Sequence, residues 1–263
     1  MQPFIFHPGP RIVSGDGSAA QLAAHLPVGP CLFVTDRDVV ALGLTDACRA
    51  TLGEVVLFDA VEADPSKETL LAAVAAGRAA GATSVIGFGG GSPMDVAKLA
   101  AYLLGSGDDL DAIWGVGLAT GRHLPLALVP TTAGTGSEAT PVAVITCEGG
   151  EKRGVNSPAL IADWAALDAS LTLGMPRALT AATGVDAMVH AIEAFTSARA
   201  TISMRSGGWG WRQSSICRWR SSRPPPEPAP RRRRFRSSPA TAGASWPLSP
   251  GRWSPTGRCS TRP

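Results

Sequence analysis

Short apolar runs alternate with helix-like stretches over residues 1–165. The apolar runs predict four buried strands, at Cys31–Thr35, Glu54–Phe58, Ser84–Phe88 and Leu124–Val129. Segments rich in Ala and Leu between them predict three helices, at Val39–Leu52, Lys67–Ala80 and Met94–Leu104. Strands that alternate with helices predict an α/β fold, in which helices cover both faces of a parallel sheet.

The pattern loosens after residue 150. Ala159–Trp164 is strand-like, and a turn is expected at Gly174–Pro176. Arg177–Ser197 then predicts a helix with an apolar stripe, interrupted at Thr183–Gly184. We therefore expect one α/β domain over residues 1–165 and the start of a truncated, all-helical domain over residues 166–199.

Composition changes abruptly near residue 199. Residues 1–199 hold 11 Lys and Arg against 20 Asp and Glu, whereas residues 200–263 hold 13 Arg and a single acid, Glu227. The formal net charge of +3 therefore averages two unlike segments. Residues 200–263 also hold 10 Pro and 12 Ser but only three Leu, Ile or Val in all. Such a segment buries too little apolar surface to fold, so we expect a disordered tail rich in Arg, Pro and Ser.

Several classes of protein are disfavoured by the sequence. No apolar run approaches the roughly 18–20 residues that span a bilayer. Residues 1–17 lack the basic and apolar segments of a signal peptide. The cysteines are scattered and odd in number, which is typical of reduced thiols in a cytoplasmic protein (Cys31, Cys48, Cys147, Cys217 and Cys259).

A glycine-rich loop lies between the third predicted strand and the helix after it. In Gly89–Ser92, residues without bulky side chains let backbone N–H groups approach an anion, and the following helix adds the positive end of its dipole. A pyrophosphate would fit there. A tight structural turn is the alternative interpretation, since short glycine motifs are weak signals.

Polar residues near this loop are compatible with a dinucleotide. Asp36 closes a strand, where a carboxylate would bind ribose hydroxyls and favour NAD over NADP; it would equally cap the next helix. The loop Thr131–Ser137 would wrap the other side of the ligand or form an ordinary polar turn. Asp95 and Lys98 lie three residues apart on one helix face, and their plain interpretation is a surface ion pair.

Asp186 and His190 lie four residues apart in the last predicted helix, on one face. Oxygen and nitrogen ligands together suit Fe(II), Zn(II) or a similar ion. A surface or structural contact is the alternative. Two ligands do not make a tight metal site, so further ligands would have to come from elsewhere.

Three segments together resemble the iron-containing alcohol dehydrogenase family. They are GFGGGSPMDVAK (87–98), PTTAGTGSEATPVAVIT (130–146) and GMPRALTAATGVDAMVHAIEAFTS (174–197). The resemblance covers residues 1–199. It implies a dinucleotide-binding α/β domain, a helical domain and an active site between them.

The resemblance also implies the site residues. The family's NAD contacts map to Asp36, Asp64, Gly89, Gly90, Gly91, Ser92, Asp95, Thr131, Thr132 and Lys152. Asp186 and His190 match two of its metal ligands, with iron expected and zinc an alternative. The implied reaction passes hydride between a small alcohol or aldehyde and the nicotinamide, with a Lewis-acid metal and no assigned side-chain base. The intact parent is expected to be a homo-oligomer.

The sequence departs from the family after His190. The family completes its metal site with two later histidines, in a GxxHxxxHxxG-like segment, and no histidine follows His190 here. A change of reading frame in GC-rich DNA would produce such a tail. We therefore expect a truncated relative with a defective metal site, prone to aggregate because its helical domain exposes side chains such as Met188 and Ile192. The alternatives are a dinucleotide-binding module without catalysis, or a nucleic-acid-binding arm around Arg231–Arg234.

Overall fold

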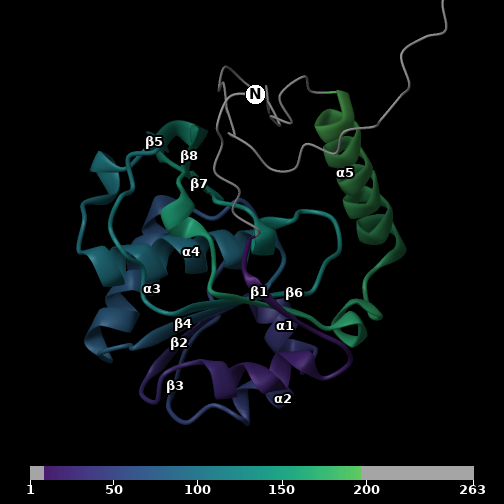
Figure 1. The fold of residues 1–263 in the computed structure, drawn as a ribbon, viewed down its shortest axis with the longest axis horizontal. Helices are drawn as coiled ribbons and strands as arrows, with labels where there is room; N and C mark the ends of the chain where they lie inside the picture. The colour runs from purple at the N-terminus through teal and green to yellow at the C-terminus, as the bar shows by residue number, and fades with distance from the viewer. Residues whose placement is uncertain (1–8, 197–263) are drawn as a thin grey trace, which may run out of the picture. The chain divides into compact units, whose positions relative to one another are not determined.

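In the computed structural model, residues 9–196 are described, and they all lie within a single compact unit. Six strands form a sheet in the order β1-β9-β6-β4-β2-β3, and every adjacent pair is parallel (Figure 1). The strands are β1 (Arg11–Ser14), β2 (Cys31–Val34), β3 (Val55–Phe58), β4 (Ser84–Gly89), β6 (Leu126–Pro130) and β9 (Trp164–Leu167). The predicted α/β fold with a parallel sheet is confirmed.

Helices cover both faces of this sheet. On one face lie α3 (Lys67–Ala79) and α4 (Gly91–Ser106), which pack against each other. The 3₁₀ helix η1 (Ser18–His25) and α2 (Asp46–Arg49) pack on the other. Alternate residues of β2 divide between the two cores: Leu32 and Val34 join the α3–α4 core, and Cys31 and Phe33 join the η1–α2 core. This alternation explains why β2 reads as a continuous apolar run.

The helix predicted over Val39–Leu52 is in fact two short ones. A turn that contains Gly43, with φ of +70°, separates α1 (Arg37–Ala41) from α2. A residue without Cβ adopts this left-handed conformation at little cost, so the chain turns there. The helices predicted over Lys67–Ala80 and Met94–Leu104 are confirmed as α3 and α4.

A second sheet was missed in the sequence. It has the order β5-β8-β7, with β5 (Gly115–Val116) parallel to β8 (Lys152–Asn156), and β8 antiparallel to β7 (Val142–Thr146). Helix α4 contacts β4 and β6 on one side and β7 on the other, so it lies between the two sheets. Five short 3₁₀ helices follow α4 along the chain, η2 (Leu110–Ala112), η3 (Ser137–Ala139), η4 (Glu148–Gly150), η5 (Pro158–Leu160) and η6 (Ala169–Thr172).

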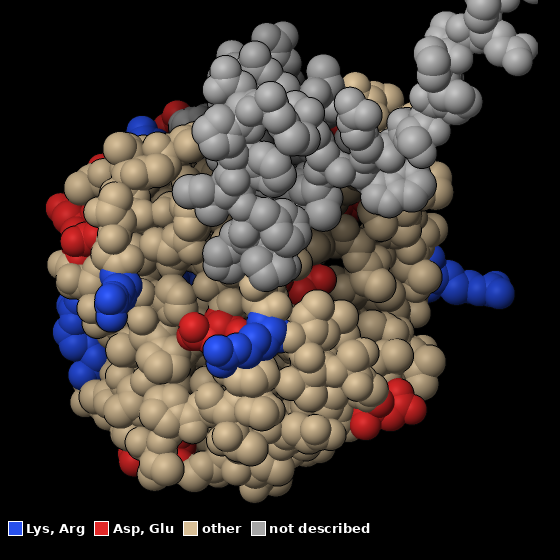
Figure 2. Space-filling view, in the orientation of Figure 1, with Lys and Arg blue, Asp and Glu red and all other residues tan. Residues whose placement is uncertain are grey.

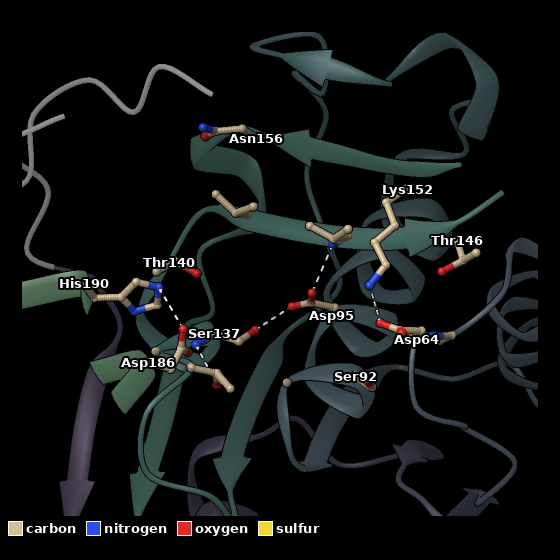
Figure 3. A pocket seen from close by; sticks show the side chains of 16 residues that line it. Asp64, Ser92, Asp95, Ser137, Thr140, Thr146, Lys152, Asn156, Asp186 and His190 are labelled. Atoms are coloured by element: carbon tan, nitrogen blue, oxygen red, sulfur yellow. Dashed lines mark hydrogen bonds and ion pairs between the residues drawn. The ribbon is translucent and has the colours of Figure 1, made fainter. Parts of the chain in front are cut away.

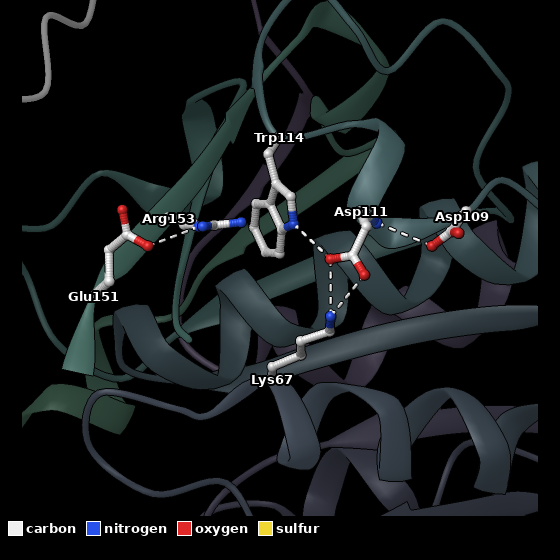
Figure 4. Close-up of polar contacts among 6 residues, drawn as sticks. All are labelled: Lys67, Asp109, Asp111, Trp114, Glu151 and Arg153. Atoms are coloured by element: carbon white, nitrogen blue, oxygen red, sulfur yellow. Dashed lines mark hydrogen bonds and ion pairs between the residues drawn. The ribbon is translucent and has the colours of Figure 1, made fainter. Parts of the chain in front are cut away.

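Polar contacts tie α3 to the segment that leads into β5 (Figure 4). The ammonium of Lys67, the first residue of α3, donates to both carboxylate oxygens of Asp111 at 2.8 and 2.9 Å. Asp111 also accepts from the indole N–H of Trp114 at 3.1 Å. The hydrogen bond from Lys67 lowers the pKa of Asp111. The bonds from Lys67 hold η2 against the start of α3.

The segment after β8 differs from its prediction. The strand expected over Ala159–Trp164 is a 3₁₀ helix, η5, followed by extended chain, and β9 begins only at Trp164. Helix α5 (Arg177–Thr196) runs without interruption at Thr183–Gly184. Its apolar side chains are exposed, with 59% of Met188 and 58% of Ile192 accessible, as expected for these two residues.

The structure tests the predictions about cysteines and membrane helices only within the described residues. The three cysteines within the described range are free thiols (Cys31, Cys48 and Cys147). None of the helices over residues 9–196 is long and apolar enough to cross a membrane. The predicted disordered tail at 200–263, with its Arg-rich stretch, lies outside the described residues, and the domain boundaries at 165 and 199 stay predictions.

Candidate functional site

The glycine loop lies at the point where the strand order of the large sheet reverses. From β2 the chain continues to β3 on one side, and then to β4 on the other side of β2. Asp36 follows β2, and Gly89–Gly91 ends β4 and begins α4. In open α/β sheets, ligands bind outside the carboxyl ends of the strands at such a reversal.

No side chain caps the start of α4. Its N-cap residue is Gly90, which makes no side-chain hydrogen bond to the first turn. Gly87, in β4, allows the helix to pack closely, because a Cβ there would lie 2.6 Å from the Cβ of Ala97. A Cβ on Gly90 would meet nothing nearer than Thr132, at 3.8 Å. The loop therefore leaves open space in front of uncapped N–H groups, which fits the phosphates of a dinucleotide.

Asp36 is half-buried beside this loop. Its Oδ1 accepts from the N–H of Val39 at 2.8 Å, which confirms the helix-cap interpretation. Its Oδ2 faces the loop, since a Cβ on Gly89 would lie 3.2 Å from it. Burial raises the pKa of Asp36. One carboxylate oxygen thus caps α1, and the other faces the glycine loop.

Thr131 and Thr132 follow β6, on the other side of the loop. The N–H of Thr131 donates to the carbonyl of Gly89 at 2.8 Å, which joins the two loops. The hydroxyl of Thr132 is buried and has no hydrogen-bond partner within residues 9–196. A buried hydroxyl without a partner is unfavourable, and a bound ligand would supply one.

A pocket of about 500 Å³ opens next to the start of α4 (Figure 3). Seven of the twelve residues expected to bind cofactor or metal line it: Asp64, Gly91, Ser92, Asp95, Lys152, Asp186 and His190. The other five are not among its lining residues, Asp36, Gly89, Gly90, Thr131 and Thr132. These five lie together around the ends of β2, β4 and β6, as the contacts above show.

One face of the β7–β8 pair forms a wall of the pocket. Cross-strand pairing places Val142 opposite Asn156 and Thr146 opposite Lys152. All four line the pocket, as does Val144 between them. The wall is therefore apolar in the middle and polar toward both ends.

Lys152 and Asp64 form an ion pair at one end of this wall. The ammonium lies 2.5 Å from Oδ1 of Asp64, and both side chains are more than half exposed. Asp64 has a positive φ of 55°, the only such non-glycine residue in the described range. Non-glycine residues rarely adopt this backbone conformation, so the loop before α3 has an unusual geometry at Asp64.

Asp95 and Lys98 do not form a surface pair, so that interpretation is wrong. Lys98 is fully buried between the two sheets, and its ammonium donates to Ser137 Oγ at 2.8 Å and to the carbonyl of Val142 at 2.9 Å. Asp95 accepts from the hydroxyl of Ser137 at 2.6 Å and from the N–H of Val144 at 3.0 Å. Burial lowers the pKa of Lys98 to about 8, and burial also raises the pKa of Asp95. The pair fixes β7, and with it the pocket wall, to α4.

Asp186 and His190 lie together on α5 and line the same pocket. Their Oδ1 and Nε2 atoms are 3.8 Å apart. His190 Nε2 is buried and has no hydrogen-bond partner among the described residues. These donors fit a divalent cation as two of its ligands. Residues 9–196 contain no cluster of three or more His, Cys, Asp or Glu that would complete the site.

Four residues of the pocket wall were not anticipated: Val142, Val144, Thr146 and Asn156. The strand at residues 142–146 could have been predicted, because it is a run rich in β-branched residues between Pro141 and Gly149–Gly150. Asn156 itself argued against a strand, since asparagine is depleted in strands. It is also the only asparagine in the chain.

The fold is that of a doubly wound α/β protein, a class in which ligands bind outside the carboxyl ends of the strands. A model of the iron-containing alcohol dehydrogenase family matches residues 9–169. The chain therefore belongs to the iron-containing alcohol dehydrogenase family.

Relatives support this assignment. The chain is 38% identical over 206 residues to a sulfoacetaldehyde reductase of Bilophila wadsworthia, covering 75% of this chain and 53% of that protein. The structure of a 1,3-propanediol oxidoreductase matches with a TM-score of 0.70 and 32% identity, over 73% of this chain and 52% of that one. A sulfoacetaldehyde reductase from Bifidobacterium kashiwanohense in complex with NAD⁺ matches with a TM-score of 0.66 and 30% identity, over 76% and 55%. The chain spans about half the length of these relatives.

Proposed function

We propose that this chain contains the cofactor-binding half of an NAD-dependent, metal-dependent alcohol dehydrogenase that acts on a small alcohol or aldehyde. The observation that carries the proposal is the uncapped start of α4 beside Asp36, opening on a pocket that reaches Asp186 and His190. The proposal also assigns the protein to the cytoplasm. The free thiols at the described cysteines support this location, because disulfides are rare there.

The residues of the chain divide the task between them. Backbone N–H groups of Gly91 and Ser92 bind the pyrophosphate, and Asp36 binds the adenosine ribose with the oxygen that faces the loop. Asp186 and His190 would hold the iron or zinc ion. The bound cofactors supply a hydride acceptor and a Lewis acid; the chain positions them and the substrate.

Titration with NADH tests the proposed binding of the dinucleotide. We expect saturable binding by the full chain, followed by fluorescence. Gly90→Leu should weaken it by at least about tenfold, because the new side chain fills the open space before α4. Gly53→Leu is the matched control, since a Cβ there meets nothing within 4 Å and the residue is exposed and does not line the pocket. Equal NADH affinity in both variants would contradict the proposed phosphate site.

Asp36→Asn tests the preference for NAD. Asparagine caps helices as well as aspartate does, so α1 stays intact while the carboxylate charge is lost. We expect affinity for NADPH to rise by about tenfold relative to NADH, because the repulsion of the 2′-phosphate is removed. An unchanged ratio would assign Asp36 to the helix cap alone.

Measurement of alcohol oxidation tests the proposed metal site. Two ligands hold a divalent ion weakly, and no histidine follows His190 in the sequence. We therefore propose that the 263-residue chain binds NADH but turns over alcohols poorly. Oxidation of ethanol or 1,2-propanediol at ordinary enzyme rates with NAD and Fe(II) would refute this.

A further inference from the structure

Asn156 carries an unused hydrogen-bond donor in the pocket. The residue is only 6% exposed, yet it lines the pocket. Its Nδ2 atom is buried and has no hydrogen-bond partner in the described part of the chain. A buried amide donor without an acceptor is unfavourable, so native proteins nearly always pair such a group with protein, water or ligand.

The position of Asn156 assigns it to one end of the pocket. Asn156 and Lys152 lie on the same face of β8, four residues apart, which places them about 13 Å from each other at 3.3 Å per residue. Figure 3 shows Asn156 on the side of the pocket where His190 and Asp186 lie, with Lys152 and Asp64 on the opposite side. Asn156 therefore faces the substrate end of the proposed site, away from the Lys152–Asp64 pair.

The charges around the pocket favour a neutral partner for this donor. Among the described lining residues, Lys152 is the only lysine or arginine, and it is already paired with Asp64. A hydroxyl suits an amide well because it both accepts from the NH₂ group and donates to the amide oxygen, whereas a carboxylate or sulfonate only accepts.

We propose that Asn156 selects substrates that carry a second, neutral oxygen in addition to the reacting alcohol or aldehyde oxygen. This inference rests on the proposed function, because it places the reacting oxygen at the Asp186–His190 end. A site that hydrogen-bonds a substrate hydroxyl discriminates against the analogue without it, since the buried partner is then left unpaired. The pocket differs in this respect from one built for an anionic substrate.

The single asparagine makes a direct test possible. Labelling the full chain with [¹⁵N]asparagine gives one side-chain NH₂ group in the NMR spectrum, that of Asn156. With NADH bound, we expect ethane-1,2-diol to shift this NH₂ signal, and 1-propanol, which has the same size without the second oxygen, to leave it in place. This readout requires neither turnover nor a substitution.

Affinities measured by the same titrations give the second test. The diol should bind about tenfold more tightly than 1-propanol, the effect of one hydrogen bond to a buried donor. It should also bind more tightly than glycolate, in which a carboxylate replaces the second hydroxymethyl group. Asn156→Leu should abolish the preference for the diol, whereas Gln21→Leu, which removes an exposed amide outside the pocket, should retain it.

The outcomes separate this inference from the proposed function. Absence of NADH binding would overturn both. Normal NADH binding with equal affinity for the diol and 1-propanol, or tighter binding of glycolate, would overturn the role of Asn156 alone. If Asn156→Leu does not fold, the NH₂ signal of the labelled wild-type chain still decides the question.

Discussion

Helices α4 and α5 have similarly apolar sequences but opposite surroundings. Ten of the 16 residues of α4 are buried, and the large sheet and the β5-β8-β7 sheet cover it on two sides. Helix α5 has 20 residues, and its six large apolar side chains are 42–74% exposed: Leu179, Val185, Met188, Val189, Ile192 and Phe195. Figure 1 shows α4 inside the fold and α5 at its margin.

The difference shows that an apolar pattern predicts a helix but does not provide its covering layer. The second sheet that covers α4 comes from residues 115–156 of the same chain. Contact between α5 and the rest includes the close approach of Thr183 to Gly134, where an added Cβ would lie 2.1 Å from the Thr183 carbonyl oxygen. Six exposed apolar side chains on one helix are unusual for a monomeric surface and mark a face that is suited to packing.

The largest expected effect comes from shortening one methionine in each helix. Met94 in α4 is fully buried, and Met188 in α5 is 59% exposed. Met94→Ala should lower the free energy of unfolding by about 2–5 kcal/mol, because it leaves a cavity in the core. Met188→Ala should change it by less than about 0.5 kcal/mol. Urea unfolding followed by circular dichroism measures both, and equal losses would remove the distinction between the two helices.

A second prediction concerns the buried charge in α4. The pKa of Lys98 falls from 10.5 to about 8 in the folded chain because burial disfavours the ammonium. Between these values the unfolded chain binds more protons than the folded one, so the contribution of Lys98 to stability rises with pH through that window. The rise amounts to roughly 3 kcal/mol over the whole window. Below pH 8 both states are protonated and the contribution is constant.

Lys98→Met isolates this effect, because the other titrating groups are common to both proteins. The free energy of unfolding of the wild type minus that of the variant should increase between pH 8 and 10.5. Cys48, whose pKa burial raises to about 12, has the opposite pH dependence and cancels in the difference. A difference that stays flat across this window would show that Lys98 keeps its ordinary pKa.

The contrast between the helices also explains what the sequence could predict. The prediction of a strand, a loop and a helix around Gly89–Gly91 was correct because the apolar runs and turn residues that indicate them lie within 25 residues of one another. The prediction of a surface position for Lys98 was wrong because its partners, Ser137 and Val142, lie about 40 residues further along the chain. The sheet in that region was missed. The proximity of Asp186 and His190 was predictable because their spacing of four is local to one helix. Asn156 was missed because its role depends on cross-strand pairing with Val142.

The smallest effect on folding is expected from adding charge to α5. Met188→Lys with Ile192→Lys should change the free energy of unfolding by less than about 0.5 kcal/mol, because both positions are already exposed. Association between chains should change instead, since the wild-type helix presents apolar surface to neighbouring molecules. Light scattering at increasing concentration should show self-association of the wild type and less of it in the double variant. A monodisperse wild type would mean that the apolar face of α5 is covered in solution, and α5 would then resemble α4 more closely than its described surroundings indicate.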